Sequence, residues 1–247
     1  MEKLRYYIAH NDGLRVLRGD GAGFQELGEF FAGRTVEHIE GRRDRPEVVF
    51  AAVAFDGGYR TDDGGRTWQK VMDGDVRTFA VDPHDENVVY MGAGPVRLWR
   101  SQDGGKTFEP LDGMLDFPDS VTAKWSPPAA YVGKETAHVR HVFIHPQDRD
   151  LLFVLLEHGG VLLSRDGGKT WSDRSAGIDY VDMHVIENLP GSTESYCVSS
   201  AQGFYRTDDA GLTWRRAEHG MPWAGQPRYC YSHEWRVLKG DPPRLIV

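Results

Sequence analysis

The sequence predicts an all-β fold made of repeated four-stranded antiparallel units, and three observations support this prediction. An eight-residue pattern, Ser/Thr-x-Asp-x-Gly-x-Thr-Trp/Phe, occurs four times in the 247 residues. The copies lie 40, 63 and 43 residues apart, counted from their first residues. Three short apolar segments of strand length precede the copies. A period of about 40–50 residues with short strands inside it is typical of β-propeller blades.

The repeated pattern describes a tight hairpin turn between two strands. A short Asp side chain accepts hydrogen bonds from the N–H groups of the turn, and Gly adopts the positive φ that other residues resist. The aromatic residue starts the returning strand as a packing anchor. One carboxylate in a tight turn does not supply the six or more oxygens that calcium needs, so these residues are predicted to be structural. The predicted structural residues are Asp63, Trp68, Asp103, Phe108, Asp166, Trp171, Asp209 and Trp214.

The chain, taken in order, reads as one propeller domain over residues 1–247. The second blade, for example, is predicted from Thr35–Gly41, Glu47–Val53, Gly58–Arg60 and Thr67–Val71. A long insertion between blades is predicted at 112–137. The predicted blades cover 4–28 (partial), 35–72, 76–111, 138–175, 181–218 and 230–247 (partial).

The two ends of the chain are irregular. Residues 4–28 lack a first strand, and residues 230–247 supply a first strand followed by the beginning of a second. A C-terminal first strand that paired with the N-terminal strands would close a propeller of about five blades. A chain that ends inside an apolar strand instead favours part of a six- or seven-bladed propeller, which is the interpretation we prefer.

On these turn motifs, the chain resembles the Asp-box (bacterial neuraminidase repeat) β-propeller proteins. The resemblance implies that the turns join strands three and four on the face opposite the ligand site. It also implies a ligand face built from the strand two–three turns and the inter-blade loops. Sialidases and glucan hydrolases share the fold, but the Arg-Ile-Pro signature of sialidases is absent from this sequence.

Two inter-blade loops are rich in aromatic residues and are predicted to hold ligand-binding residues. The 112–137 insertion contains Trp125 and Tyr131, and the 220–229 loop contains Trp223. Neither tryptophan occupies a position that blade packing requires, and Trp is frequent in binding hot spots. The alternative is that Trp125 folds its loop down over the channel as a plug.

A row of histidines is the second candidate site. His38, Thr78, His141 and His184 each lie 25 residues before the Asp of their turn, and His138 and Arg140 flank the row. Since first strands line a propeller channel, these side chains could converge on a ligand. The structural alternative, which we favour, is a half-buried ring bonded to the backbone of a neighbouring blade.

Composition narrows the range of functions. The net charge of −8 and the absence of a basic run give no support to nucleic-acid binding. No segment reads as a membrane span, and the start of the chain has no apolar signal region, so a cytoplasmic location is the default expectation and an exported form stays open. Two cysteines without neighbouring ligands predict neither a disulfide framework nor a metal site, and no cofactor is predicted.

Two functional hypotheses remain. The first is a non-catalytic scaffold that binds a protein or glycan through its loop face, and it is preferred because no catalytic set is visible. The second is an exo-acting glycoside hydrolase that uses two carboxylates across a cleft. Its candidate acids near the predicted ligand face are Asp56, Asp75, Asp116, Asp119, Glu157 and Asp182.

Overall fold

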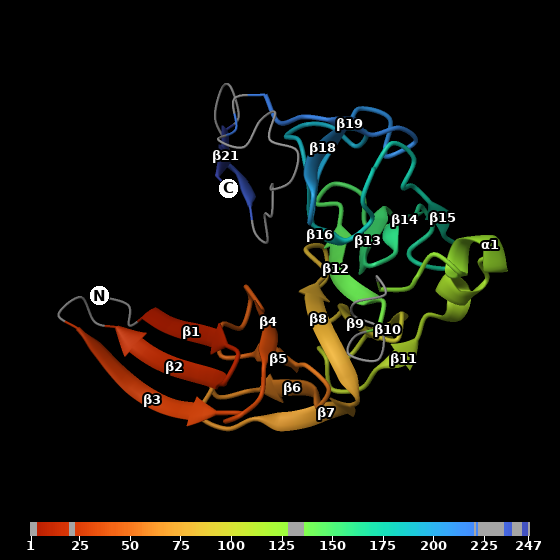
Figure 1. Ribbon diagram of the computed structural model, residues 1–247. Helices are drawn as coiled ribbons and strands as arrows, with labels where there is room; N and C mark the ends of the chain where they lie inside the picture. Colours follow the sequence, from red (N-terminus) through yellow and green to blue (C-terminus); the bar gives the residue numbers. More distant parts are fainter. Residues whose placement is uncertain are drawn as a thin grey trace. The chain divides into compact units, whose positions relative to one another are not determined.

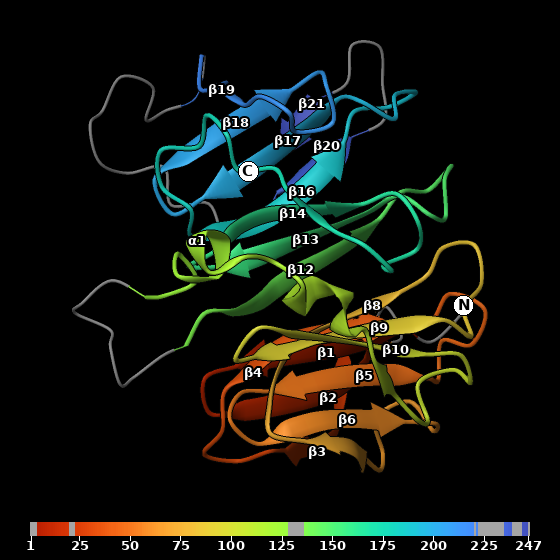
Figure 2. The same ribbon diagram turned by 90° about the vertical axis from the view of Figure 1, so that its right-hand side faces the viewer.

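The computed structural model describes residues 4–19, 23–127, 136–219, 221, 235–238 and 244–246, and its chain forms two compact units. The first unit comprises residues 1–94 and 98–110, and the second comprises 95–97 and 111–247. Both are built from antiparallel sheets whose neighbouring strands are consecutive in sequence (Figure 1; Figure 2). The single-domain prediction concerns how the units combine, and it stays a prediction.

Three sheets form the first unit, and the described part of the N-terminal sheet has three strands. Its strands are β1 (Leu4–His10), β2 (Gly13–Gly19) and β3 (Phe24–Phe30). The second sheet contains β4 (Val36–Gly41), β5 (Val49–Val53), β6 (Gly57–Thr61) and β7 (Gln69–Asp73). The third contains β8 (Asp75–Val81), β9 (Val89–Gly94), β10 (Arg97–Ser101) and β11 (Glu109–Pro110).

The second unit begins with two short helical turns and continues into three sheets. The helical turns are η1 (Asp112–Leu115) and α1 (Asp119–Thr122), both inside the predicted insertion. The next sheet contains β12 (His138–Ile144), β13 (Leu152–Glu157), β14 (Gly160–Ser164) and β15 (Ser172–Asp173). It is followed by β16 (Met183–Asn188), β17 (Tyr196–Ser200), β18 (Gly203–Thr207) and β19 (Arg215–Arg216). The last described strands are β20 (Arg236–Leu238) and β21 (Arg244–Ile246), which pair with each other.

These sheets confirm the predicted all-β fold of four-stranded antiparallel blades. The turn motif joins the third and fourth strands in all four complete sheets, as the sequence predicted. The outer strands β11, β15 and β19 are only two residues long. The inner strands carry the apolar core, and β13 and β14 are buried along almost their whole length because both of their faces are covered.

The first three Asp-box turns are closed by the same set of hydrogen bonds, and the fourth shares all but one of them. In the third copy, Asp166 Oδ1 accepts the N–H groups of Lys169 (3.0 Å) and Thr170 (2.9 Å), and its Oδ2 accepts the Thr170 hydroxyl at 2.6 Å. The Ser164 hydroxyl donates to Asp166 Oδ1 at 2.8 Å and accepts the Gly168 N–H at 2.9 Å. The Thr170 bonds lower the pKa of Asp166 to about 2, so the turn is built around a carboxylate that stays ionised at neutral pH.

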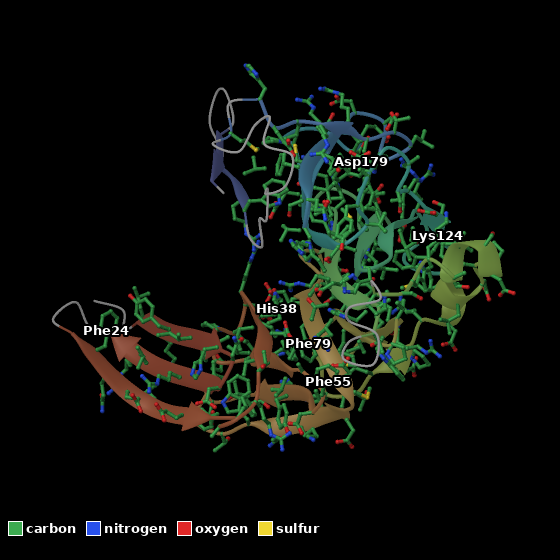
Figure 3. All side chains as sticks on the ribbon, viewed as in Figure 1. Phe24, His38, Phe55, Phe79, Lys124 and Asp179 are labelled. Atoms are coloured by element: carbon green, nitrogen blue, oxygen red, sulfur yellow. The ribbon has the colours of Figure 1, made fainter. Side chains whose placement is uncertain are left out.

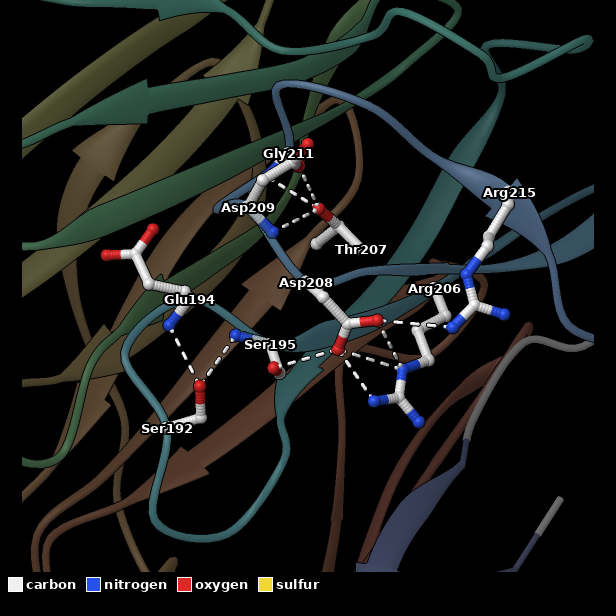
Figure 4. Close-up of polar contacts among 9 residues, drawn as sticks. All are labelled: Ser192, Glu194, Ser195, Arg206, Thr207, Asp208, Asp209, Gly211 and Arg215. Carbon is white, nitrogen blue, oxygen red and sulfur yellow. Dashed lines mark hydrogen bonds and ion pairs between the residues drawn. The ribbon is translucent and has the colours of Figure 1, made fainter.

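The fourth turn departs from the others at one position. Thr207 and Asp209 repeat the bonding pattern, and the Gly211 N–H donates to the Thr207 hydroxyl at 2.9 Å (Figure 4). Ala210, however, takes the place that Gly167 holds in the third turn, and its φ is 51°. An L-residue with a Cβ is strained in this left-handed region, whereas glycine is not. The turn geometry therefore tolerates one strained residue while most of the surrounding bonds are kept.

The box aromatics pack to different extents. Trp214 is 5% exposed in a core cluster that contains Phe153, Tyr196 and Tyr205, and its Nε1 donates to the Arg174 carbonyl at 2.6 Å. Trp171 is only half-buried and donates to the Gly168 carbonyl of its own turn at 3.0 Å. Trp214 is therefore a core residue, while Trp171 mainly closes its own turn.

Candidate ligand-binding site

Strand register places the starts of the first strands at the end of each sheet opposite the Asp box. In the β12–β15 sheet, Ile144 lies opposite Leu152 and Leu152 lies opposite Ser164, the first residue of the box. At the other end, His138 lies opposite Glu157, and a short turn joins Leu156 to Gly160. We call this second end the loop end of the sheet. It corresponds to the face where ligand-binding residues were predicted.

A β-bulge shapes the loop end of every complete sheet. The register of β4, β8, β12 and β16 shifts directly after Val36, Val76, Val139 and Met183, respectively. The residues on either side of each buried apolar residue are mostly ionisable, and we call them the rim pairs. Bulges re-aim side chains and are common beside functional sites. The rim pairs are Thr35–Glu37, Asp75–Arg77, His138–Arg140 and Asp182–His184.

In the second unit, one rim pair surrounds the carboxylate of Glu157. His138 Nε2 lies 3.3 Å and Arg140 Nε lies 3.6 Å from Glu157 Oε2, and the His138 side chain is only 2% exposed. Burial raises the pKa of Glu157, but the hydrogen bond to His138 and the electrostatic interactions with His138, Arg140 and His158 outweigh it. The net effect lowers the pKa of Glu157 to about 2. Glu157 is therefore ionised throughout the physiological pH range.

The neighbouring rim pair extends this charge cluster. Asp182 Oδ2 lies 3.8 Å from His158 Nδ1, and Asp182 Oδ1 lies 3.7 Å from His184 Nε2. His158 is 6% and His184 is 1% exposed. His158 sits in the β13–β14 turn with a φ of 61°, which directs its side chain towards the start of β16. The loop end of this unit thus holds three buried histidines between two carboxylates.

The first unit uses permanent charges at the same positions. Arg77 donates to both carboxylate oxygens of Asp75, at 2.7 and 3.1 Å, and to Glu37 at 3.1 Å. The Phe55 ring covers its guanidinium at 4.4 Å, and the Phe55 N–H donates to Asp75 at 2.9 Å. Figure 3 labels Phe55 and His38 on this unit. Arg77 is 5% exposed, so this loop end is closed by a buried ion cluster.

A hollow of about 510 Å³ lies beside the His138–Glu157 cluster, within the second unit. Three segments form its walls, namely the β9–β10 turn, the insertion, and the two residues before β12. Most of the lining is apolar, and Arg97 is the charged side chain among the lining residues described. The lining residues are Pro95, Val96, Arg97, Leu115, Thr122, Trp125, Ser126, Pro127, Thr136 and Ala137.

Trp125 connects the hollow to the charge cluster. Its ring meets Phe117 edge-on, with centroids 5.8 Å apart, and it also lies over Gly159 in the β13–β14 turn. A Cβ on Gly159 would stand 3.1 Å from Trp125 Cδ1 and 2.8 Å from Leu156 Cδ1, so only glycine allows this close approach. The predicted ligand residue Trp125 is therefore at the loop end, half-buried between the insertion and the blade.

The structure corrects the predicted row of histidines. His184 directly follows Met183 and so occupies the bulge position of Arg77 and Arg140 instead of the position of His38 and His141. Val185 takes the place of the third histidine. The count of 25 residues fails in this blade because only Ala201 and Gln202 separate the paired ends of β17 and β18, one residue fewer than between β13 and β14.

The two histidines that do share a position bond to the backbone of the next blade. His38 Nδ1 accepts the Phe79 N–H at 3.3 Å, and His141 Nδ1 accepts the Ile186 N–H at 3.2 Å. These are the bonds that the structural alternative predicted for the row. Ligand binding by these residues stays a prediction.

Two other predicted site residues, Tyr131 and Trp223, lie outside the described residues. Sequence reasoning missed His158, Gly159 and Arg97, which the fold brings to the cluster and the hollow. A signal for His158 exists, because His158 and Phe55 both stand eight residues before a box aspartate and both have positive φ. Of the candidate acids, Asp116 and Asp119 are exposed in the helical segment, Asp182 lies 3.8 Å from His158, and Glu157 directly precedes His158 in the chain.

The described residues contain neither a metal-ion cluster nor a helix that could span a membrane. Among them, no group of three His, Cys, Asp or Glu side chains is arranged to hold a metal ion. No helix in the same ranges is both long and apolar enough to cross a membrane.

The chain carries Asp-box repeats at the turns of four-stranded antiparallel blades of the β-propeller type. A protein-family profile described as BNR/Asp-box repeat matches residues 59–70 and 162–173. Among curated proteins, the xyloglucanase Xgh74A of Acetivibrio thermocellus is 26% identical over 230 residues, which cover 76% of this chain and 25% of the xyloglucanase. The chain therefore spans about a quarter of the length of this curated relative.

Solved structures agree on the fold. A GH74 enzyme of Niastella koreensis superimposes with a TM-score of 0.60 at 16% identity, over 87% of this chain and 36% of that protein. The GH74 xyloglucanase of Xanthomonas campestris superimposes with a TM-score of 0.58 at 15% identity, over 96% of this chain and 47% of that protein. At these identities the likeness concerns the fold alone.

Proposed function

We propose that this chain binds a glycan at the hollow beside Trp125 and that its loop end acts as a binding surface without turnover. The observation that carries the proposal is the hollow itself, a concave space walled by an indole ring, prolines and aliphatic side chains. Thr122, Ser126 and Thr136 add hydroxyl groups to this lining. Apolar walls with a few polar groups match the C–H faces and hydroxyls of a sugar ring.

The relatives support a carbohydrate over a protein ligand. The curated relative and one of the solved structures are named as xyloglucanases, so xyloglucan oligosaccharides are the first probes to use. The chain covers a quarter of the curated relative, which makes the choice of glycan part of the proposal.

Binding is favoured over hydrolysis by the state of the acids at the loop end. A glycosidase needs one carboxylic acid that keeps its proton near neutral pH in order to protonate the leaving group. Glu157 has its pKa lowered to about 2, because hydrogen bonding and nearby positive charges outweigh burial. Asp182 lies between two histidines. These two acids are therefore better placed to hold the histidines than to donate protons.

A glycoside hydrolase is the second candidate function, because the names of the relatives favour it. Release of reducing ends from xyloglucan by the wild-type chain, lost in Glu157→Gln, would support the hydrolase and contradict the binding proposal.

The test of the proposed function is calorimetric titration with a xyloglucan oligosaccharide. Trp125→Ala should weaken binding at least tenfold, while Trp125→Phe should retain most of the affinity because it keeps an aromatic wall. Leu212→Ala is the matched control, since Leu212 is an apolar side chain of the same unit that is 57% exposed at the last box turn. Equal affinities of Trp125→Ala and wild type would place any glycan site elsewhere.

A further inference from the structure

Both ring nitrogens of His138 face hydrogen-bond acceptors. Nδ1 lies 2.9 Å from the Thr136 carbonyl oxygen, and Nε2 lies 3.3 Å from Glu157 Oε2. A carbonyl oxygen only accepts, and so does an ionised carboxylate. Neutral histidine has a single N–H, so it satisfies one of these partners and turns a lone pair towards the other. Only the doubly protonated ring donates to both.

The surroundings of His138 favour this cation. The side chain is 2% exposed, so water does not replace a missing partner. On its own strand, Arg140 lies 3.6 Å from Glu157 Oε2 and competes for that carboxylate. In the β13–β14 turn, His158 follows Glu157 in the chain and lies 3.8 Å from Asp182, which precedes β16. A neutral His138 would leave either the Thr136 carbonyl or the ionised Glu157 without its hydrogen bond.

His138 is also tied to the wall of the hollow. Thr136, whose carbonyl it bonds, and Ala137 are two of the lining residues. On the other side, Glu157 begins the turn whose Gly159 lies against the Trp125 ring. The His138 ring therefore links the strand-entry wall of the hollow to the turn that supports its aromatic wall.

We propose that His138 is a positioning residue whose doubly protonated form holds the hollow in its binding shape, so that glycan affinity falls when His138 loses a proton. The inference rests on the proposed function for the ligand. The two bonds of His138, to the Thr136 carbonyl and to Glu157, are called the clamp below, and they concern only residues of this chain. Loss of the proton removes one of the two bonds, which releases either the Thr136 segment or the Glu157 turn.

The sign of the pH effect follows from this arrangement. Binding requires the protonated ring, so the affinity is highest on the acid side and decreases as pH rises above about 7, in the upper part of the range where histidine titrates. Calorimetric titration with a xyloglucan oligosaccharide from pH 5.5 to 8.5 should show about tenfold tighter binding at the acid end. His138→Gln removes the charge and should give weak binding with a flat profile. The matched control His219→Gln, at an exposed histidine of the same unit, should keep the wild-type profile.

A measurement without ligand separates failure of the clamp from failure of the proposed function. In nitrogen NMR of ¹⁵N-histidine-labelled protein, the signal that disappears in His138→Gln should show a doubly protonated ring at pH 7. A neutral ring at pH 7, or a wild-type affinity that does not change with pH, would overturn the clamp. If the wild-type chain binds no oligosaccharide at any pH while the ring is doubly protonated, the clamp stands and the proposed function fails.

Discussion

The rim pairs of the two units lie at equivalent bulges, but their acidic residues have different partners, arginine in the first unit and mainly histidine in the second. In the first unit, Arg77 makes a bidentate interaction with Asp75 and a third hydrogen bond to Glu37, and the Phe55 ring covers its guanidinium group. In the second, the acids bond or approach histidines, and the bulge residue Arg140 is the more distant partner of Glu157 at 3.6 Å. A guanidinium fork is rigid and always charged, whereas an imidazole changes its charge near neutral pH.

This difference shows that one backbone feature serves two purposes. The bulge turns a side chain towards the loop end in both units, and the residue type decides the result. In the first unit, Arg77 forms a permanently charged link between the β4 and β8 blades. In the second unit, His138, which forms a rim pair with Arg140, adjoins the hollow, so its protonation can be linked to a bound ligand.

The largest expected effect is on the free energy of unfolding and tests the ion cluster of Arg77. Arg77→Met leaves Asp75 and Glu37 without their buried partner and should lower the free energy of unfolding by about 3–5 kcal/mol. The loss should be similar at pH 5.5 and 8.5, because the contacts of Arg77 described above are with two carboxylates and an aromatic ring and not with a histidine. Denaturant unfolding measures it, with the exposed Arg66→Met as the control expected to stay within about 0.5 kcal/mol of wild type. A neutral effect of Arg77→Met would show that the cluster contributes no net stability.

A smaller effect is expected for the histidine cluster. Glu157→Gln weakens a charged hydrogen bond and should cost about 1.5–3 kcal/mol at pH 6. The folded state lowers the pKa of Glu157 from 4.5 to about 2, so its contribution is present above pH 4.5 and is lost as pH falls towards 2. The difference between wild type and variant should therefore shrink from pH 6 to pH 3 in chemical denaturation. A constant difference over that range would contradict the ion-pair role of Glu157.

The smallest effect concerns the box turns of the two units. Gly64 and Gly104 provide the positive φ in the first unit, and Ala210 adopts it with strain in the second. Ala210→Gly should remove that strain and raise the free energy of unfolding by roughly 0.5–1 kcal/mol. The extra conformational entropy that glycine loses on folding reduces this gain. The reverse change, Gly104→Ala, should destabilise, because a Cβ there would stand 2.5 Å from Arg42 Nη1. A thermal melting comparison of the two variants checks both signs.

The turns, the blade period and the four strands of each complete blade could be predicted from the sequence, because they depend on local chemistry. Asp166 bonds to residues within four positions of itself, so its role can be read from eight letters. The same locality makes the box a guide to fold and a poor guide to function. The position of Trp125 at the loop end also followed from sequence, because its loop lies between a fourth strand and the next first strand.

Only the tertiary structure decided which side chains meet. A turn one residue shorter between β17 and β18 moved His184 from the predicted row into the bulge position beside Asp182. The hollow draws its walls from three segments, and the contact of Trp125 with Gly159 joins residues 34 positions apart in the chain. The sequence gives no distance between such segments, since bulges and turn lengths set the register through pairing with neighbouring strands.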